Sequence, residues 1–122
     1  MTKDRIEKMV VIASRVAIKA ESRDEFLRST ATLLEPTRAE ADCLTYLFCE
    51  DSMQANHFLF FEEWRSRAGF ERHHASAKIK NYEAKIPAWL AETVTVNLYR
   101  IKDVTVMSSE PAGEQINSAE SE

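Results

Sequence analysis

The 122-residue sequence has little of the material from which cofactor loops, sharp turns and cross-links are made: 2 glycines, 3 prolines and 2 cysteines. Gly69 and Gly113 stand far apart, so there is no glycine-rich loop of the kind that cradles phosphates, and we expect no nucleotide or other cofactor. No apolar run approaches the ~18 residues that a membrane-spanning helix needs. The charged segment Met1 to Lys8 leads to no signal-peptide cleavage site, so we expect a cytoplasmic protein without a membrane partner.

An excess of basic charge is also missing. The chain holds 16 Lys and Arg against 20 Asp and Glu, a net charge of −4. All the basic residues precede Ser108, whereas the residues from Ser108 on hold Glu110, Glu114, Glu120 and Glu122, so the rest of the chain is neutral. A neutral body without a basic stripe matches a phosphate backbone poorly, and we expect no nucleic-acid partner. The composition predicts one folded domain over residues 1–107 and a disordered acidic tail over residues 108–122.

The two cysteines are six residues apart, at Cys43 and Cys49, within one predicted strand. At ~3.3 Å per residue they lie about 20 Å apart, which is too far for a disulfide. We expect two free thiols that pack as small buried hydrophobic groups, and a reactive thiol is the alternative.

Four segments have the composition of strands, because they are rich in β-branched and aromatic residues and contain no glycine or proline. They are residues 8–18, 43–50, 57–64 and a segment within 92–105 that is centred on TVTVNLYRI.

Helices are predicted between these strands. Ser22 and Glu25 form an S-x-x-E capping box ahead of apolar residues at helical spacing. Pro36 is expected to end or kink that helix, because proline lacks the backbone N–H. Ser66 and Ser76 are placed to cap two shorter helices after the third strand.

The resulting order, β-α-β-β-α-β, predicts an α+β fold of the ferredoxin-like type: a four-stranded antiparallel sheet with helices on one face. The third strand carries large apolar groups on both faces, with Phe58 and Phe60 on one side and Leu59 and Phe61 on the other. Since helices cover only one face, the other needs a partner. A second copy related by a two-fold axis would supply it, so we expect a homodimer.

A set of residues in a fixed order carries a family resemblance. These are VVIASRVAI, Thr37-Arg38-Ala39-Glu40, Cys43-Leu44-Thr45-Tyr46, Phe58-Leu59-Phe60-Phe61-Glu62-Glu63-Trp64, Ala68 and His73. On these residues the chain resembles the antibiotic biosynthesis monooxygenase family over about residues 8–101. The resemblance implies a dimeric α+β barrel and a family that includes quinol monooxygenases.

The chain departs from some branches of that family. Polyketide-oxidising members have Asn and Tyr where this chain has Phe60 and Phe70, so two polar groups for substrate handling are replaced. The positions of the haem-degrading members' Asn, Trp and His are matched here by Ser14, His73 and Glu83. The resemblance therefore argues against haem degradation and leaves a quinol or small-metabolite role.

The resemblance also implies a set of site residues. His73 is the candidate catalytic base, because an imidazole titrates near neutral pH. Trp64 offers a ring for stacking and an N–H donor. The other candidate substrate-binding residues are Phe60, Phe70, Glu62 and Ser14.

Each assignment has a structural alternative. His73 would then be a surface histidine beside His74, the aromatic residues would be core, and Glu62 would form an ion pair with Arg15. No metal site is predicted, because adjacent histidines on a helix point ~100° apart and the chain has no H-x-x-x-H or C-x-x-C pair.

The function that the resemblance favours is the oxidation of a small quinol-like or polyphenolic compound with O₂ and without a cofactor. Two alternatives stay open. One is isomerase-type chemistry on a small phosphorylated or keto metabolite, and the other is a small-molecule-binding or stress-related dimeric module without turnover.

Overall fold

The sheet is built from four strands whose side chains alternate between a covered and an uncovered face. The computed structural model describes residues 8–113. Its strands are β1 (Val10–Ala17), β2 (Cys43–Glu50), β3 (His57–Trp64) and β4 (Thr95–Arg100). They lie in the order β2-β3-β1-β4, and every neighbouring pair is antiparallel. This arrangement confirms the predicted ferredoxin-like α+β fold.

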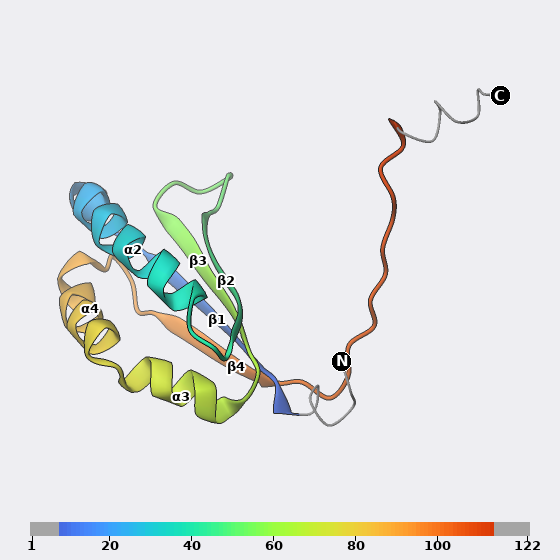
Figure 1. Cartoon of the computed structure of the whole chain (residues 1–122). Coiled ribbons are helices and arrows are strands. Elements are labelled where there is room, and N and C mark those ends of the chain that lie inside the picture. The colour runs from blue at the N-terminus through green and yellow to red at the C-terminus, as the bar shows by residue number, and fades with distance from the viewer. Residues whose placement is uncertain (1–7, 114–122) are drawn as a thin grey trace.

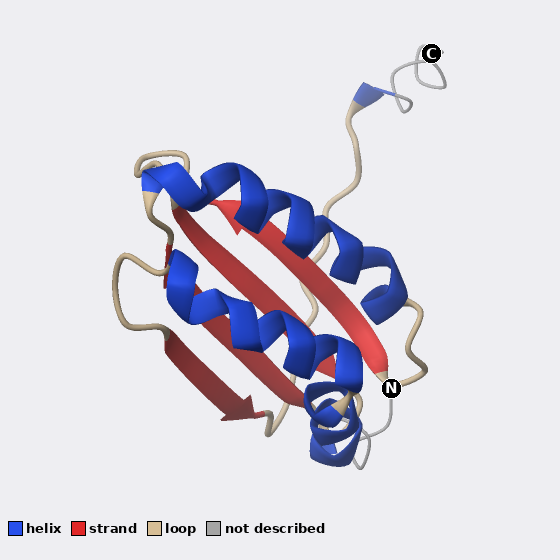
Figure 2. Ribbon diagram, turned by 90° about the vertical axis from the view of Figure 1, so that its left-hand side faces the viewer, coloured by secondary structure: helices blue, strands red, loops and turns tan. Residues whose placement is uncertain are grey.

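The helices form a single layer on one face of the sheet (Figures 1 and 2). They are the short 3₁₀ helix η1 (Ala20–Ser22), α2 (Arg23–Arg38), α3 (Arg67–Ala75) and α4 (Ala77–Trp89). None of the helices within residues 8–113 has the length and apolarity needed to cross a membrane.

The main core lies between this helix layer and the sheet. The register of β3 against β1 directs Phe58, Phe60, Glu62 and Trp64 to the same side as Val10, Ile12, Ser14 and Val16. Apolar residues of α2 and α4 pack against the strands from the other side, including Phe26, Leu33 and Trp89. A smaller cluster of Val10, Ile12 and Trp64 continues the core towards α3.

Helix α2 begins and ends differently from the prediction. Ser22 occupies the N-cap position, but its side chain makes no capping hydrogen bond, because its backbone (φ −100°, ψ −1°) belongs to the preceding 3₁₀ turn. Pro36 lies inside the helix, which continues to Arg38. The missing N–H removes one backbone hydrogen bond near the helix end. The next residue, Thr37, is fully buried against the core, although its hydroxyl has no hydrogen-bond partner among the described residues.

A polar clasp joins the start of α2 to the β2–β3 hairpin. The Arg23 guanidinium donates to both carboxylate oxygens of Glu50, at 2.5 and 2.7 Å, and to Oδ1 of Asn56 at 2.9 Å. Asn56 has a positive φ of 67°, a backbone conformation that asparagine tolerates better than most residues. The clasp fixes the hairpin against the helix at the end of the sheet opposite α3.

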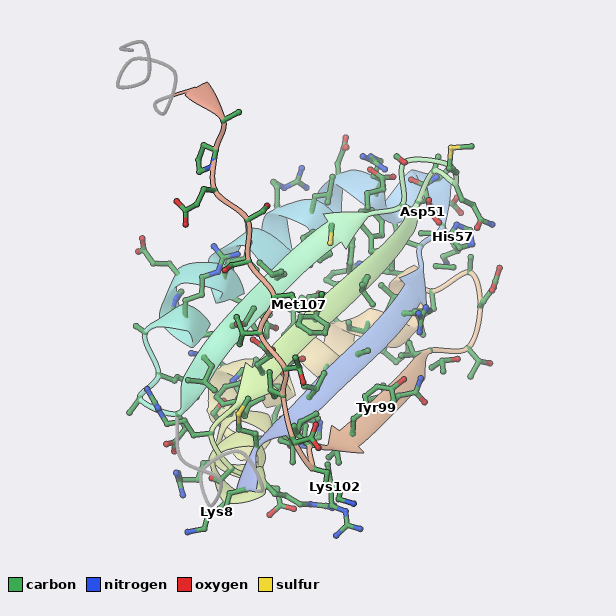
Figure 3. All side chains as sticks on the ribbon, turned by 90° about the vertical axis from the view of Figure 1, so that its right-hand side faces the viewer. Lys8, Asp51, His57, Tyr99, Lys102 and Met107 are labelled. Carbon is green, nitrogen blue, oxygen red and sulfur yellow. The ribbon has the colours of Figure 1, made fainter. Side chains whose placement is uncertain are left out.

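The second face of the sheet carries no helix (Figure 3). Half-buried Leu59 and Phe61 lie at its centre, and Leu47 and Tyr99 are about half exposed on the flanking strands. We call this surface the open face. It is the face on which the sequence places apolar groups that the helices do not cover.

Both cysteines are free thiols, as predicted. The expectation that both are buried is wrong for Cys49, which is exposed, whereas Cys43 is half-buried. The reason is the register of β2: Cys49 pairs with Leu59 and therefore lies on the open face.

The chain leaves the sheet after Arg100. Residues 101–111 form neither helix nor strand and extend away from the sheet (Figure 1). Val104, Val106 and Met107 are exposed there. Most of the predicted acidic tail, residues 114–122, lies outside the described residues, as do residues 1–7.

Candidate functional site

A cavity of about 250 Å³ lies between the helix layer and the sheet. Its walls come from every major element. The lining residues with polar or aromatic side chains are Ser14, Tyr46, Phe60, Glu62, Phe70, His73, His74, Tyr82 and Glu83. Aliphatic residues of β1, α2, α4 and β4, and Val94 just before β4, line the rest.

The mouth of the cavity is marked by its most exposed lining residues. Val96 on the edge strand β4 is 57 % exposed. Across from it, the exposed His74 on α3 lies 2.8 Å from the Glu83 carboxylate on α4. Ligands would therefore enter between β4 and the corner where α3 meets α4.

His73 lies inside the cavity wall because α3 is held close to the sheet. Ser66 caps the helix by accepting a hydrogen bond from the Gly69 N–H at 3.0 Å. A Cβ atom at Gly69 would stand 2.5 Å from Cβ of Asp42, so this close approach requires glycine. One turn further on, His73 points inward and is 4 % exposed, while His74 faces outward, as their ~100° separation predicts.

The His73 imidazole is oriented by Glu40. Nδ1 of His73 lies 2.8 Å from Oε2 of Glu40, and Lys78 Nζ lies 3.4 Å from the same oxygen. A carboxylate only accepts hydrogen bonds, so Nδ1 carries the proton and Nε2 keeps its lone pair. Burial lowers the pKa of His73 below 6.5, against the opposing effect of Glu40. At neutral pH the side chain is therefore a neutral base.

Trp64 stands behind the cavity wall and not in it. Its side chain is fully buried and does not line the cavity, so it offers no surface for direct stacking on a ligand. Its ring centroid lies 4.7 Å from that of His73, and its Nε1–H donates to Oε1 of Glu62 at 2.9 Å. Trp64 thus holds two polar groups that do line the cavity.

Glu62 is a buried carboxyl on the central strand β3, 7 % exposed. The alternative ion pair with Arg15 is not formed, because Arg15 pairs with Leu59 and lies on the open face. Burial raises the pKa of Glu62 to about 7, and Glu40 and Glu83 add to the rise, against the lowering effect of the Trp64 hydrogen bond. The group thus changes its charge close to neutral pH.

The other predicted residues gather around these groups. Ser14, Phe60 and Phe70 all line the cavity, from β1, β3 and α3. Tyr46 lies next to Glu62 across the β2–β3 pair, and burial raises the pKa of its hydroxyl. Tyr99, the other strand tyrosine, is half exposed and does not line the cavity.

Sequence reasoning did not assign a role to Glu40 or to the residues of α4 in the cavity. In the sequence Glu40 is only the last residue of the run Thr37-Arg38-Ala39-Glu40, and it stands 33 residues before its partner His73. No local pattern links residues so far apart, and only the crossing of α2 and α3 over the sheet brings them together. Among residues 8–113, no three His, Cys, Asp or Glu side chains are grouped so as to hold a metal ion.

Comparison with known proteins places this arrangement in a family. A family model described as antibiotic biosynthesis monooxygenase matches residues 9–85, which include Glu40, Glu62, Trp64 and His73. The chain belongs to the antibiotic biosynthesis monooxygenase family. The resemblance seen in the sequence is thereby confirmed.

Individual proteins are similar to this chain in sequence or in fold. Protein sll1783 of Synechocystis is 33 % identical over 98 residues, which cover 80 % of this chain and 67 % of that protein. A crystal structure described as an antibiotic biosynthesis monooxygenase is 30 % identical with a TM-score of 0.69, and the match covers 84 % of this chain and 99 % of the other. A conserved protein from Methanosarcina mazei, 21 % identical, shares the fold with a TM-score of 0.76 over 83 % of this chain and all of its own.

Proposed function

We propose that this family member is a cofactor-independent monooxygenase that oxidises a small quinol-like or polyphenolic compound with O₂. The observation that carries the proposal is a largely apolar cavity lined by one buried, neutral histidine whose proton position is set by Glu40. Such a base can take a proton from a hydroxyl group, and the apolar surroundings strengthen its interaction with the ligand.

The chemistry needs no reductant other than the substrate. His73 takes the proton of a ring hydroxyl, and the resulting anion gives one electron to O₂. The substrate radical and superoxide combine through a new bond between oxygen and a ring carbon, and a returned proton completes a hydroperoxide. Loss of the hydrogen on that carbon then breaks the O–O bond, releases water and leaves a carbonyl. One oxygen atom enters the product and the other becomes water, and the substrate supplies all four electrons.

The charged residues that line the cavity do not favour a phosphorylated substrate. The lining contains Glu62 and Glu83, and no lysine or arginine of the described chain lines it. Phosphate groups are normally bound by cationic side chains or by backbone N–H groups at a helix N-terminus. An uncharged aromatic ligand fits this lining better.

The test is a measurement of where the oxygen goes. The protein is incubated with a panel of hydroquinones and polyphenols under ¹⁸O₂, and oxygen uptake and product mass are followed. We expect one O₂ consumed per substrate, one labelled oxygen in the product and no hydrogen peroxide. Uptake that does not exceed the protein-free background would refute the proposal and favour a binding module. Unlabelled quinone with hydrogen peroxide would also refute it, because it indicates a simple oxidase.

We also propose that two copies associate through the open face. Leu59 and Phe61 at its centre, with Leu47 and Tyr99 beside them, form an apolar surface of the kind that marks an interface. A two-fold axis would let each copy cover the other's surface.

The expected result is a dimeric mass by light scattering at micromolar concentration. A Phe61→Glu variant should have the mass of a monomer, because it would place two charges in the interface, whereas Met53→Glu on the exposed hairpin turn should stay dimeric. A monomeric mass for the unaltered protein would contradict the proposal.

A further inference from the structure

Glu62 has one oxygen engaged and one free. Oε1 accepts the Trp64 Nε1–H at 2.9 Å. Within residues 8–113 no donor is bonded to Oε2, although the carboxyl is buried and lines the cavity. Among the described residues, Thr37 Oγ1 is the one side-chain oxygen that is both enclosed and unpaired, so Glu62 Oε2 is open to the cavity and can accept a hydrogen bond from a ligand there.

The free oxygen belongs to the same wall as the base. The Trp64 ring lies against the His73 ring, with centroids 4.7 Å apart, and its Nε1–H donates to Oε1 of Glu62, so one indole ring contacts both residues. Both His73 and Glu62 line the cavity. His73 Nε2 carries a lone pair, and Glu62 Oε2 carries lone pairs as well. The wall therefore presents two acceptors and calls for a ligand with two donors.

The charged and titratable groups around Glu62 fix the sign of the ligand's charge. Tyr46 faces it from β2, His73 from α3, and Tyr82 and Glu83 line the same cavity from α4. Glu40, two residues after the end of α2, raises the pKa of Glu62 through space, as does Glu83. Lys78 contacts Glu40 at 3.4 Å and Lys80 contacts Glu83 at 3.6 Å, but neither lysine is among the residues that line the cavity. The cavity therefore offers carboxylates and no cation to a ligand, which favours a neutral hydroxyl over an anion.

We propose that Glu62 is a specificity-determining residue that receives the second hydroxyl of the substrate, so that the cavity selects neutral dihydroxyarenes over monohydric phenols. The proposal rests on the proposed function for the identity of the first acceptor, His73. Under this proposal the role of Glu62 is to bind the substrate and not to stabilise the fold. A diol satisfies both acceptors, whereas a phenol with one hydroxyl leaves one of them unpaired, and such a mismatch discriminates strongly.

The test measures binding without turnover. Dissociation constants of hydroquinone and 4-methoxyphenol are determined anaerobically by calorimetry at pH 8, for the unaltered protein and for Glu62→Gln. The two probes differ only in one hydroxyl, which the methyl ether replaces. We expect the unaltered protein to bind the diol about 10- to 100-fold more tightly, the value of a hydrogen bond to a charged acceptor.

The Glu62→Gln variant is expected to lose this preference. The Trp64 N–H still needs an acceptor, so the amide oxygen turns towards it and the NH₂ group faces the ligand. A hydroxyl and an ether oxygen can both accept a hydrogen bond from this NH₂ group, so the two probes should bind about equally. Glu71→Gln is the matched control, because Glu71 is exposed on α3 and pairs only with Arg67, at 3.0 Å. It should keep the preference of the unaltered protein.

The outcomes separate this inference from the proposed function. Equal binding of both probes by the unaltered protein, including no binding of either, would overturn the inference. A diol preference that survives in Glu62→Gln would overturn it as well, even if oxygen is consumed. If the diol preference depends on Glu62 but no oxygen is incorporated, the inference holds and the monooxygenase proposal fails.

Discussion

Replacing His73 with glutamine is expected to lower the rate of substrate oxidation by about 10²- to 10⁴-fold, the usual contribution of a positioned base. Glutamine has a similar length and can still donate to Glu40, but it cannot take a proton. The fold should persist, because Glu40 keeps its contact with Lys78 at 3.4 Å. Initial rates of oxygen uptake with an accepted hydroquinone provide the measurement.

The pH profile gives this prediction a second readout. The base acts only when neutral, so the rate should rise with pH as His73 loses its proton. Because burial lowers the pKa of His73, the rise should be centred below pH 6.5. In His73→Gln that rise should disappear. Glu40→Gln should lower the rate by a smaller factor, since the imidazole remains but its proton position is no longer fixed by a charge.

His57→Gln is the control for these variants. His57 lies at the opposite end of the sheet, where its Nδ1 contacts the backbone oxygen of Ala55 at 3.1 Å, and it does not line the cavity. The rate of substrate oxidation by His57→Gln, and the pH dependence of that rate, should match those of the unaltered protein. An unchanged rate in His73→Gln would remove His73 from the chemistry, and Glu62 would then be the remaining base in the cavity.

Truncating Phe26 to alanine is expected to lower the free energy of unfolding by about 3–5 kcal/mol, the typical cost of such a cavity. Phe26 is fully buried on α2 and packs against Phe58, Phe48 and Trp89, with ring centroids 4.9, 5.7 and 6.0 Å away. These contacts join the helix to two strands and to α4. Their loss leaves a void that rigid strands cannot close.

Urea denaturation checks this prediction through the midpoint and slope of the transition. Because the loss is a large part of a domain's stability, Phe26→Leu provides a milder variant that is expected to show an intermediate loss. Met53→Ala is the control, since Met53 is 91 % exposed on the hairpin turn and should stay within about 0.5 kcal/mol. A loss below 1 kcal/mol for Phe26→Ala would mean that the core repacks around the gap.

Local patterns predicted the strands well. Residues 43–50 and 57–64 were expected as strands from composition alone, and both have those bounds in the structure. The alternation along residues 57–64 also placed Phe58 and Phe60 on one face and Leu59 and Phe61 on the other, as the register confirms. Side-chain period and β-branched composition act within a few residues, so one sequence is enough to read them.

What the sequence could not predict depends on contacts between distant segments. The bond between Glu40 and His73 and the burial of Trp64 behind the cavity wall are set by how α2 and α3 cross the sheet. The position of Pro36 inside α2 has a similar cause, because the packing of the buried face of the helix, which includes Phe26 and Leu33, outweighs the local preference of proline to end a helix. In each case the position of the residue is set by packing between distant segments, and a short stretch of sequence contains no pattern that predicts such packing.

The mouth of the cavity, between Val96 and the His74–Glu83 pair, lies on the helix side of the sheet. Covering the open face therefore leaves the route for ligand exchange unobstructed. The two cavities of a dimer would then bind and release ligand independently, because neither copy would block the cavity mouth of the other. In such a dimer the proposed interface and the proposed entrance for small molecules would lie on different faces of the sheet, so a substitution in one would leave the other intact.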